Sequence, residues 1–328
     1  MDESVKVYLP GRGEPRICAI GGGHGLSTLL RGLKYLSSNI TAIVTVADDG
    51  GGSGMLREDL GILPPGDIRN CILALANTEP IMEQVFDYRF PEGSLKGQSF
   101  GNLFLAALNG ISDSFDQAVT RMGQVLSIVG RVLPVTNENV FLEAEFENGS
   151  TILGESKIFM AKKENDCRIS RVRLIPEHPK ALAQSVEAIL NADLVLLGPG
   201  SLYTSIIPNL LVDGISDALK ETKAKRVYVL NIMTQDGETE GYSAADHVNA
   251  LFRHGGGKIF DYCLSNSRSL PESVRKAYAL EDAEELMAKQ GELDPLGVQT
   301  FWAPLTATGT YARHDPAALG RALMQILN

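Results

Sequence analysis

Apolar positions along the chain alternate between two spacings, and the alternation predicts an α/β fold. Two β-branched runs, residues 16–20 (RICAI) and 40–46 (ITAIVTV), are typical of buried parallel strands. Between them, leucines recur at helical spacing from Leu26 to Leu36, which predicts a helix directly after a glycine turn. We therefore expect a strand, a helix and a second strand with a right-handed crossover.

The middle of the chain is mainly helical in pattern, and residues 67–130 contain no convincing strand. This stretch is long for a crossover, so we expect a helical insert within one domain that spans residues 1–328. After the hairpin region, predicted strands and helices alternate again, and the last predicted helix covers residues 316–327. We expect its strands in the segments DLVLLGPGS, RVYVLN, KIFDYCLSN and 298–305.

A β-hairpin is predicted between the helical insert and the later strands. Residues 140–146 and 151–156 alternate apolar and polar positions on either side of an Asn-Gly pair, which is a strong hairpin signal. Residues 168–175 are a candidate third antiparallel strand. We expect this hairpin region, residues 140–175, to pack on an edge of the main sheet.

Composition and charge argue against several classes of protein, namely nucleic-acid-binding, exported and membrane proteins. The 328 residues include 30 basic and 40 acidic side chains, and the net charge of −10 opposes nonspecific binding to nucleic acid or to anionic lipid. The four cysteines are far apart and form no CxxC pair, which favours buried thiols in a reducing compartment. No signal peptide and no apolar run of about 18 residues is evident. We expect a cytoplasmic protein without membrane insertion.

Glycine-rich turns provide the first candidate chemistry. Residues 21–25 (GGGHG) and 198–205 (GPGSLYTS) each follow a predicted strand, so backbone N–H groups and a helix N-terminus would face an anion such as phosphate. Leu26 occupies the place of the third glycine of a dinucleotide fingerprint, and a P-loop motif is missing. Ser99 and Asn102 mark a third helix start. Tight packing and ordinary helix capping would also explain these residues.

Carboxylates provide the second candidate chemistry. Asp48 and Asp49 end the second strand, a predicted glycine loop follows at 50–54, and Asp67 is the predicted N-cap of the next helix. These acids could recognise a ribose, bind Mg²⁺ together with phosphate, or act as a general base; a purely structural role in the turn and the cap is the alternative. We expect both glycine turns and the aspartates at 48 and 49 to surround one pocket.

The chain resembles the YvcK family of gluconeogenesis factors, within the broader YvcK and CofD-like superfamily. The resemblance covers about residues 16–316 and is carried by GGGHGLSTLLRGLK, ITAIVTVADDGGGSG, PPGDIRN, SFGNL, GESKI, NADLVLLGPGSLYTSIIPNLL, NIMTQDGETEGYSAADH and RHD. It implies a Rossmann-like, mostly parallel doubly wound sheet with a helical insert and an edge β-hairpin. It also implies a cytoplasmic bacterial dimer that binds a UDP-sugar such as UDP-N-acetylglucosamine.

The proteins of that family are linked to cell shape and peptidoglycan precursor supply during gluconeogenic growth, and they have no established catalytic activity. A sister group, the 2-phospho-lactate transferases, uses Mg²⁺, and Asp49 and Asp67 fall where that group has acids. Three positions depart from the usual family pattern: His24, Ser27 and Gln98. The predicted nucleotide-sugar contacts, in which Arg313 matches a family arginine, are Gly22, Gly23, His24, Gly25, Leu26, Asp48, Asp49, Asp67, Asn70, Ser99, Asn102, Gly200, Ser201, Leu202, Thr204, Asn231, Thr234 and Arg313.

Three functional hypotheses follow. The first is a noncatalytic sensor of a UDP-sugar that signals to a regulatory protein partner, because no nucleophile and base pair is evident beside the phosphate cradle. The second is a transferase that acts on a nucleotide-diphosphate-linked substrate, with Mg²⁺ held by Asp49 and Asp67. The third is a dinucleotide-binding protein, suggested by the initial strand, helix and strand unit.

Overall fold

The computed structural model describes residues 13–77, 80–165, 167–307 and 311–327. Its centre is a seven-stranded sheet in the order β10-β9-β8-β7-β1-β2-β3, in which every pair is parallel. The strands are β1 (Ile17–Gly21), β2 (Ile40–Val44), β3 (Arg131–Pro134), β7 (Leu194–Leu197), β8 (Lys225–Val229), β9 (Tyr262–Asn266) and β10 (Gln299–Ala303). The order runs outward in both directions from β1, so the predicted doubly wound, Rossmann-like α/β sheet is confirmed.

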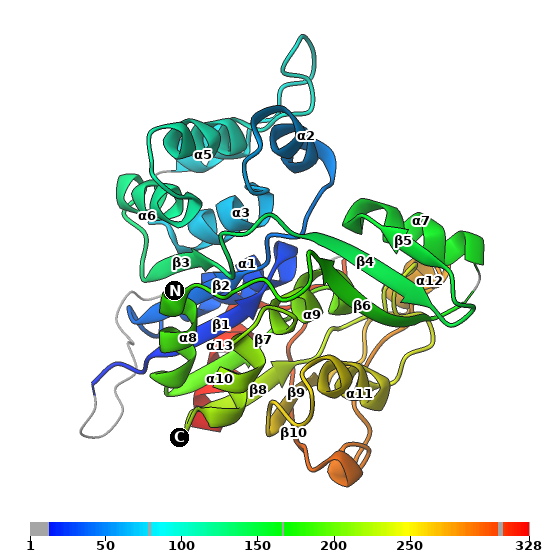
Figure 1. The fold of residues 1–328 in the computed structure, drawn as a ribbon. Coiled ribbons are helices and arrows are strands. Elements are labelled where there is room, and N and C mark those ends of the chain that lie inside the picture. The colour runs from blue at the N-terminus through cyan, green and yellow to red at the C-terminus, as the bar shows by residue number, and fades with distance from the viewer. Residues whose placement is uncertain (1–12, 78–79, 166, 308–310, 328) are drawn as a thin grey trace.

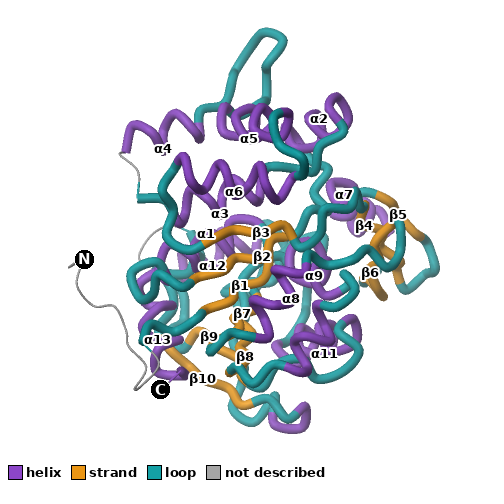
Figure 2. Tube along the Cα trace, turned by 60° about the vertical axis from the view of Figure 1, so that its left-hand side comes forward, coloured by secondary structure: helices purple, strands orange, loops and turns teal. Residues whose placement is uncertain are grey.

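Helices cover both faces of this sheet (Figures 1 and 2). On one face, α1 packs against both α3 and α13, whereas α8, α9 and α10 pack together on the other. The helices outside the segment between β2 and β3 are α1 (Gly23–Leu33), α7 (Glu155–Asn165), α8 (Ala183–Leu190), α9 (Ile207–Leu210), α10 (Ile215–Glu221), α11 (Ala244–His254), α12 (Glu272–Ala279) and α13 (Pro316–Leu327). None of the helices in the described ranges is long and apolar enough to cross a membrane.

In the described residues between β2 and β3 there are five helices, which Figures 1 and 2 show above the sheet: α2 (Gly51–Leu60), α3 (Gly66–Leu75), α4 (Pro80–Asp87), α5 (Phe100–Gly110) and α6 (Phe115–Val125). The prediction of a glycine loop at 50–54 was wrong, because these glycines begin α2. Gly54 lies inside that helix, where a Cβ would come within 2.8 Å of the Asp49 carbonyl carbon. The division of the chain into units stays a prediction.

The predicted N-cap of the next helix was also wrong. Pro65 holds the N-cap position of α3, and Asp67 lies in the first turn of the helix. A carboxylate there still benefits from the positive end of the helix dipole. Because Asp67 is not required to cap the backbone, its side chain is available to the sheet edge beside β1 and β2.

Residues 141–175 contain the predicted antiparallel strands, β4 (Phe141–Phe146), β5 (Thr151–Leu153) and β6 (Ile169–Ile175), paired in the order β5-β4-β6. The second hairpin strand is shorter than predicted, because α7 begins at Glu155. The three strands form a separate sheet, with β6 packed against α9 and with α7 packed against β4 and β5. This arrangement brings the start of α7 to the carboxyl ends of β1 and β2.

Candidate functional site

The two glycine turns touch each other where β1 and β7 end. Gly25, in the first turn of α1, faces Pro199 so closely that a Cβ would lie 2.7 Å from the carbonyl carbon of Pro199 and nearer still to its oxygen. Asn231, which follows β8, fixes the second turn: its Nδ2 donates to the Gly200 carbonyl at 2.8 Å, and the Gly200 N–H donates to its Oδ1 at 3.1 Å. Only glycine permits this approach at position 25.

Two adjoining cavities open on either side of this contact. The first, which we call the acidic lobe, has a volume of about 360 Å³ and is lined by Gly22, Gly23, His24, Gly25, Thr45, Asp48, Asp67, Glu155, Gly200, Ser201, Thr204, Ser205 and Gln235. The second, which we call the basic lobe, has a volume of about 520 Å³. Residues shared by both lobes form a waist: His24, Gly25, Gly200, Ser201 and Gln235.

Three carboxylates from different elements meet in the acidic lobe. Asp48 follows β2, Asp67 lies on α3 and Glu155 begins α7. Burial, reinforced by the charge of Asp48, raises the pKa of Asp67 to about 6. Burial also raises the pKa of Glu155 to about 8, and the charge of Asp48 adds to the rise. Each carboxylate therefore disfavours ionisation of its neighbours, so the lobe favours a cation or a group that donates hydrogen bonds.

Asp48 is supported by a hydrogen bond within its own turn. Its Oδ1 accepts a hydrogen bond from the Gly50 backbone at 2.9 Å. Burial raises the pKa of Asp48, and this hydrogen bond opposes the rise. Asp67 receives comparable support, because the Gly23 backbone donates to it and opposes the rise in its pKa.

The basic lobe combines cationic and apolar groups. Arg31 of α1 and Arg313, which precedes α13, both line it, and the Arg313 guanidinium lies 5.6 Å from the centre of the Tyr311 ring. Burial lowers the pKa of His314 to about 4, so that this imidazole is neutral at physiological pH. The apolar side chains in the same lobe are Ile232, Met233 and Ala312. Such a surface suits a flat, partly apolar ring with an anionic substituent.

The structure brings most of the predicted site residues together at these lobes. Nine of them line the acidic lobe: Gly22, Gly23, His24, Gly25, Asp48, Asp67, Gly200, Ser201 and Thr204. Asn231, Thr234 and Arg313 line the basic lobe. Their roles in binding stay predictions.

Six predicted contacts do not line either lobe. Leu26 and Leu202 are fully buried in the apolar core. Asp49 instead accepts a hydrogen bond from the Ser156 backbone at 2.8 Å, at the start of α7. The remaining three belong to α3 and α5: Asn70 accepts from Arg69, Ser99 caps α5 and Asn102 donates its backbone N–H to Ser99.

Sequence reasoning missed several lining residues. Glu155 and Gln235 lie in segments quoted for the family resemblance, GESKI and NIMTQDGETEGYSAADH, but no residue spacing indicated that they face the glycine turns. Arg31 belongs to the polar face of α1, where a charged residue is usually only solvated. These three can be identified as lining residues only when the strand order and the position of α7 are known.

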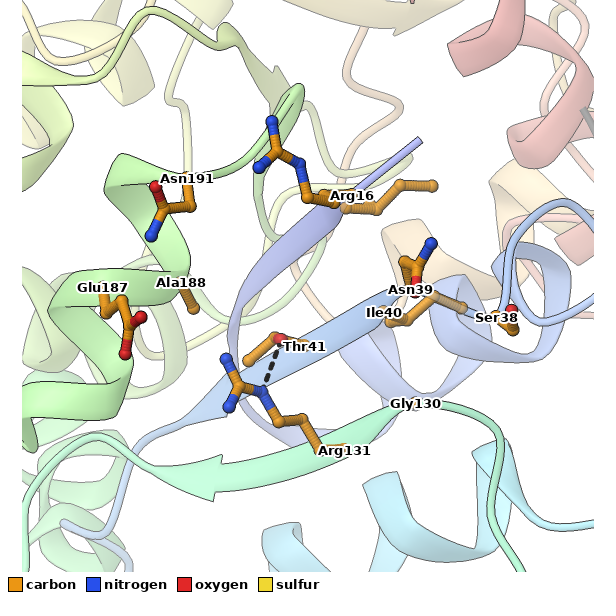
Figure 3. Close-up of a pocket in the computed structure, with 11 residues that line it drawn as sticks. Arg16, Ser38, Asn39, Ile40, Thr41, Gly130, Arg131, Glu187, Ala188 and Asn191 are labelled. Carbon is orange, nitrogen blue, oxygen red and sulfur yellow. Dashed lines mark hydrogen bonds between the residues drawn. The ribbon is translucent and has the colours of Figure 1, made fainter. Parts of the chain in front are cut away.

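A further cavity of about 370 Å³ lies at the other ends of the same strands, where β1, β2 and β3 begin (Figure 3). Arg131 donates to Thr41 there at 2.9 Å, and Arg16 pairs with Asp193. In open α/β sheets, ligands bind outside the carboxyl ends of the strands. We therefore assign the functional site to the two lobes at the glycine turns.

Comparisons with known proteins agree with this architecture. The family model described as 2-phospho-L-lactate transferase CofD matches residues 17–306. The gluconeogenesis factor of Bacillus subtilis is 46% identical over 316 residues, which span 96% of this chain and 98% of that protein. The gluconeogenesis factor of Halalkalibacterium halodurans is 47% identical over 286 residues, or 87% of this chain and 88% of that protein.

Among solved structures, a Bacillus halodurans protein described as a member of the upf0052 family superimposes with a TM-score of 0.91 at 44% sequence identity. The match covers 96% of this chain and 100% of that chain. The sequence relatives and the shared fold point to one group of proteins. The chain belongs to the 2-phospho-L-lactate transferase CofD family and, within that superfamily, to the YvcK group of gluconeogenesis factors.

Proposed function

We propose that this protein binds a nucleotide sugar of the UDP-N-acetylglucosamine type across the two lobes and acts as a ligand-dependent regulator. The observation that carries the proposal is the contact between the two glycine turns, which forms a backbone-lined waist between two cavities of different chemistry. A nucleotide sugar has the same three parts, namely a nucleoside, a diphosphate and a sugar. The two lobes and the waist supply one surface for each part.

The waist suits the diphosphate. Helix α1 begins at Gly23, whose N–H donates to Asp67, and the positive end of the helix dipole with the next N–H groups faces the waist. The Ser201 hydroxyl is oriented by a hydrogen bond to Gln235 Oε1 at 2.7 Å, and Asn231 holds the backbone of Gly200. These bonds fix the shape of the waist, and the first-turn N–H groups of α1 beyond Gly23 would bind phosphate oxygens without lysine. Binding without lysine is consistent with a chain of net charge −10.

Regulation would pass through α7. Its start contacts the site twice, through Glu155 in the acidic lobe and through the Ser156 backbone bound to Asp49. A ligand that changes the charge balance of the acidic lobe would alter the position of α7 and of the small sheet packed on it. We infer that a regulatory protein partner recognises this change, that the protein is a homodimer, and that the pathway served is peptidoglycan precursor supply and cell shape during gluconeogenic growth.

Calorimetric titration with UDP-N-acetylglucosamine tests the proposal. We expect saturable binding, and we expect Arg313→Ala to weaken it about tenfold, roughly 1.4 kcal/mol, because one charge-assisted contact is lost. Arg321→Ala is the matched control, since Arg321 is exposed on α13 and lines neither lobe. Absence of heat at millimolar ligand would contradict the proposal.

A Mg²⁺-dependent transferase is the second candidate, and the carboxylates of the acidic lobe favour it. In the described ranges, no group of three or more His, Cys, Asp or Glu side chains is arranged to hold a metal ion. Mg²⁺, however, is commonly held by one or two carboxylates together with substrate phosphates. Asp67 and Asp48 fit that pattern as the protein ligands; Asp48 takes the place of the expected Asp49, which lines neither lobe. When bound, the ion would neutralise the diphosphate leaving group.

Mass spectrometry decides between the two candidates. A nucleotide sugar is incubated with Mg²⁺, the protein and candidate acceptors, and the donor is quantified over time. Consumption of the donor that disappears in Asp67→Asn would support a transferase. An unchanged donor after long incubation, in a preparation that binds the nucleotide sugar, would rule this candidate out.

A further inference from the structure

The acidic lobe concentrates carboxyl groups on a surface without lysine or arginine, and Arg57 and Arg69 act on Asp48 and Asp67 only from outside that lining. Among the described residues that line it, none is lysine or arginine, and the only residue there that can carry a positive charge is His24. Asp48, Asp67 and Glu155 come from three separate segments of the chain, so the local structure of one segment does not account for their meeting in this cavity. Carboxylates that face a cavity accept hydrogen bonds from ligand hydroxyl groups.

A second, independent feature of the lobe also points to a ligand. Ser205 is only 8% exposed and lines the same cavity. Within the described part of the chain, its hydroxyl has no hydrogen-bond partner, and it lies beside Gly23, whose Cβ position would be 3.4 Å from it. The hydroxyl is open to the cavity rather than enclosed by protein, so it is placed to form a hydrogen bond with a ligand group.

The different linings of the two lobes indicate which end of the nucleotide sugar lies in which lobe. The basic lobe is larger and contains two arginines with apolar side chains, which suits the nucleoside. The acidic lobe is lined almost entirely by glycine, hydroxyl, carboxyl and amide groups, which suits a hydroxyl-rich sugar. With the diphosphate at the waist, the sugar therefore faces Asp48, Asp67 and Glu155.

We propose that the acidic lobe selects nucleotide sugars whose sugar is uncharged and rejects those whose sugar carries a carboxylate, with Glu155 as a specificity-determining residue; this rests on the function proposed above. A neutral sugar donates hydroxyl hydrogen bonds to the three carboxylates. At a pH at which all three acids are ionised, a sugar carboxylate would be a fourth negative charge in a partly desolvated cavity, and like charges within a few ångströms repel strongly there.

UDP-glucose and UDP-glucuronate form a matched pair of probes, because they differ only by a hydroxymethyl group or a carboxylate at the same carbon. Both are titrated calorimetrically at pH 9 in EDTA, so that no divalent cation screens the acids. At this pH Glu155 is ionised, because its pKa is about 8. The charged groups that act on it are Asp48, Glu238, Asp67 and Asp49.

We expect wild-type protein to bind UDP-glucuronate at least tenfold more weakly than UDP-glucose, and we expect Glu155→Gln to reduce that ratio several-fold. Glu187→Gln is the control, since Glu187 lies on α8 at the opposite ends of the strands and should leave the ratio unchanged. Circular dichroism verifies that both variants are folded.

Equal affinities for the two probes in the wild type would overturn the inference. It would equally be overturned by a preference for UDP-glucose that survives unchanged in both Glu155→Gln and Asp67→Asn. Either result leaves nucleotide-sugar binding intact. Failure of both probes and of UDP-N-acetylglucosamine to bind would instead refute the proposed function itself.

Discussion

Gly25 is the residue at which the two halves of the site touch. It lies inside the first turn of α1, where alanine would normally be the better helix former. The carbonyl of Pro199 occupies the space that a side chain would need. The helical preference of alanine is therefore outweighed by the requirement for close contact between the two turns.

We predict that Gly25→Ala weakens nucleotide-sugar binding by more than tenfold and lowers stability by about 1–3 kcal/mol, because the two turns must separate to admit the methyl group. Gly110→Ala is the matched control. Gly110 is likewise a helical glycine, the last residue of α5, and a Cβ there would meet nothing within 4 Å. Calorimetry and thermal unfolding measure both effects; normal binding by Gly25→Ala would show that the contact is dispensable.

Glu155 makes stability depend on pH in a definite direction. Its pKa in the folded protein is about 8, above the ordinary value of 4.5, so the folded state binds the proton more tightly than the unfolded state. Stability therefore falls as the pH rises from about 4.5 to about 8. Asp67 and Glu238, with pKa values raised by burial to about 6 and about 7, act in the same direction.

We predict that Glu155→Gln is more stable than the wild type at pH 8.5 and about equal to it at pH 4.5. The expected gain at pH 8.5 is on the order of 1–2 kcal/mol, since the carboxyl faces a cavity in which solvent screens its charge. Urea unfolding at the two pH values measures the difference. The account of the acidic lobe fails if the variant gains nothing on going from pH 4.5 to pH 8.5.

At the scale of elements, α7 is the part that connects the small sheet to the site. The pattern of residues 151–156 predicts a strand, but the strand ends at Leu153 and α7 begins two residues later. The helix starts there because the Asp49 carboxylate accepts a hydrogen bond from the Ser156 backbone. Asp49 is 107 residues away in sequence, so the local pattern does not contain this contact. A helix start that is stabilised from such a distance leaves no local signal.

We predict that Asp49→Ala loosens the first turn of α7 and destabilises the protein by about 1 kcal/mol, as expected when a helix N-terminus loses a carboxylate partner. Amide hydrogen exchange should accelerate at residues 155–158. Asp59→Ala, an exposed change on α2, is the control and should alter neither exchange nor stability measurably. Unchanged protection at the start of α7 in Asp49→Ala would contradict the role assigned to this carboxylate.

At the scale of the whole molecule, the sequence predicts the sheet well and the site in part. Buried β-branched runs and glycine turns locate the central strands, because parallel strands are apolar on both faces. The turns at β1 and β7 and Asp48 converge as predicted, whereas Asp49, expected in the same pocket, lines neither lobe, and Asp67 lies beside Asp48 instead. Glu155 and Gln235 reach the same place only through the folding of distant loops, which no local pattern records.

A crystal structure of the protein grown with UDP-N-acetylglucosamine is the most direct test of the central claim. The account predicts diphosphate density at the waist between Gly25 and Gly200, with the sugar beside Glu155 and the nucleoside beside Arg313. Density for the ligand in the cavity at the amino ends of β1, β2 and β3, or sugar and nucleoside in exchanged lobes, would contradict it.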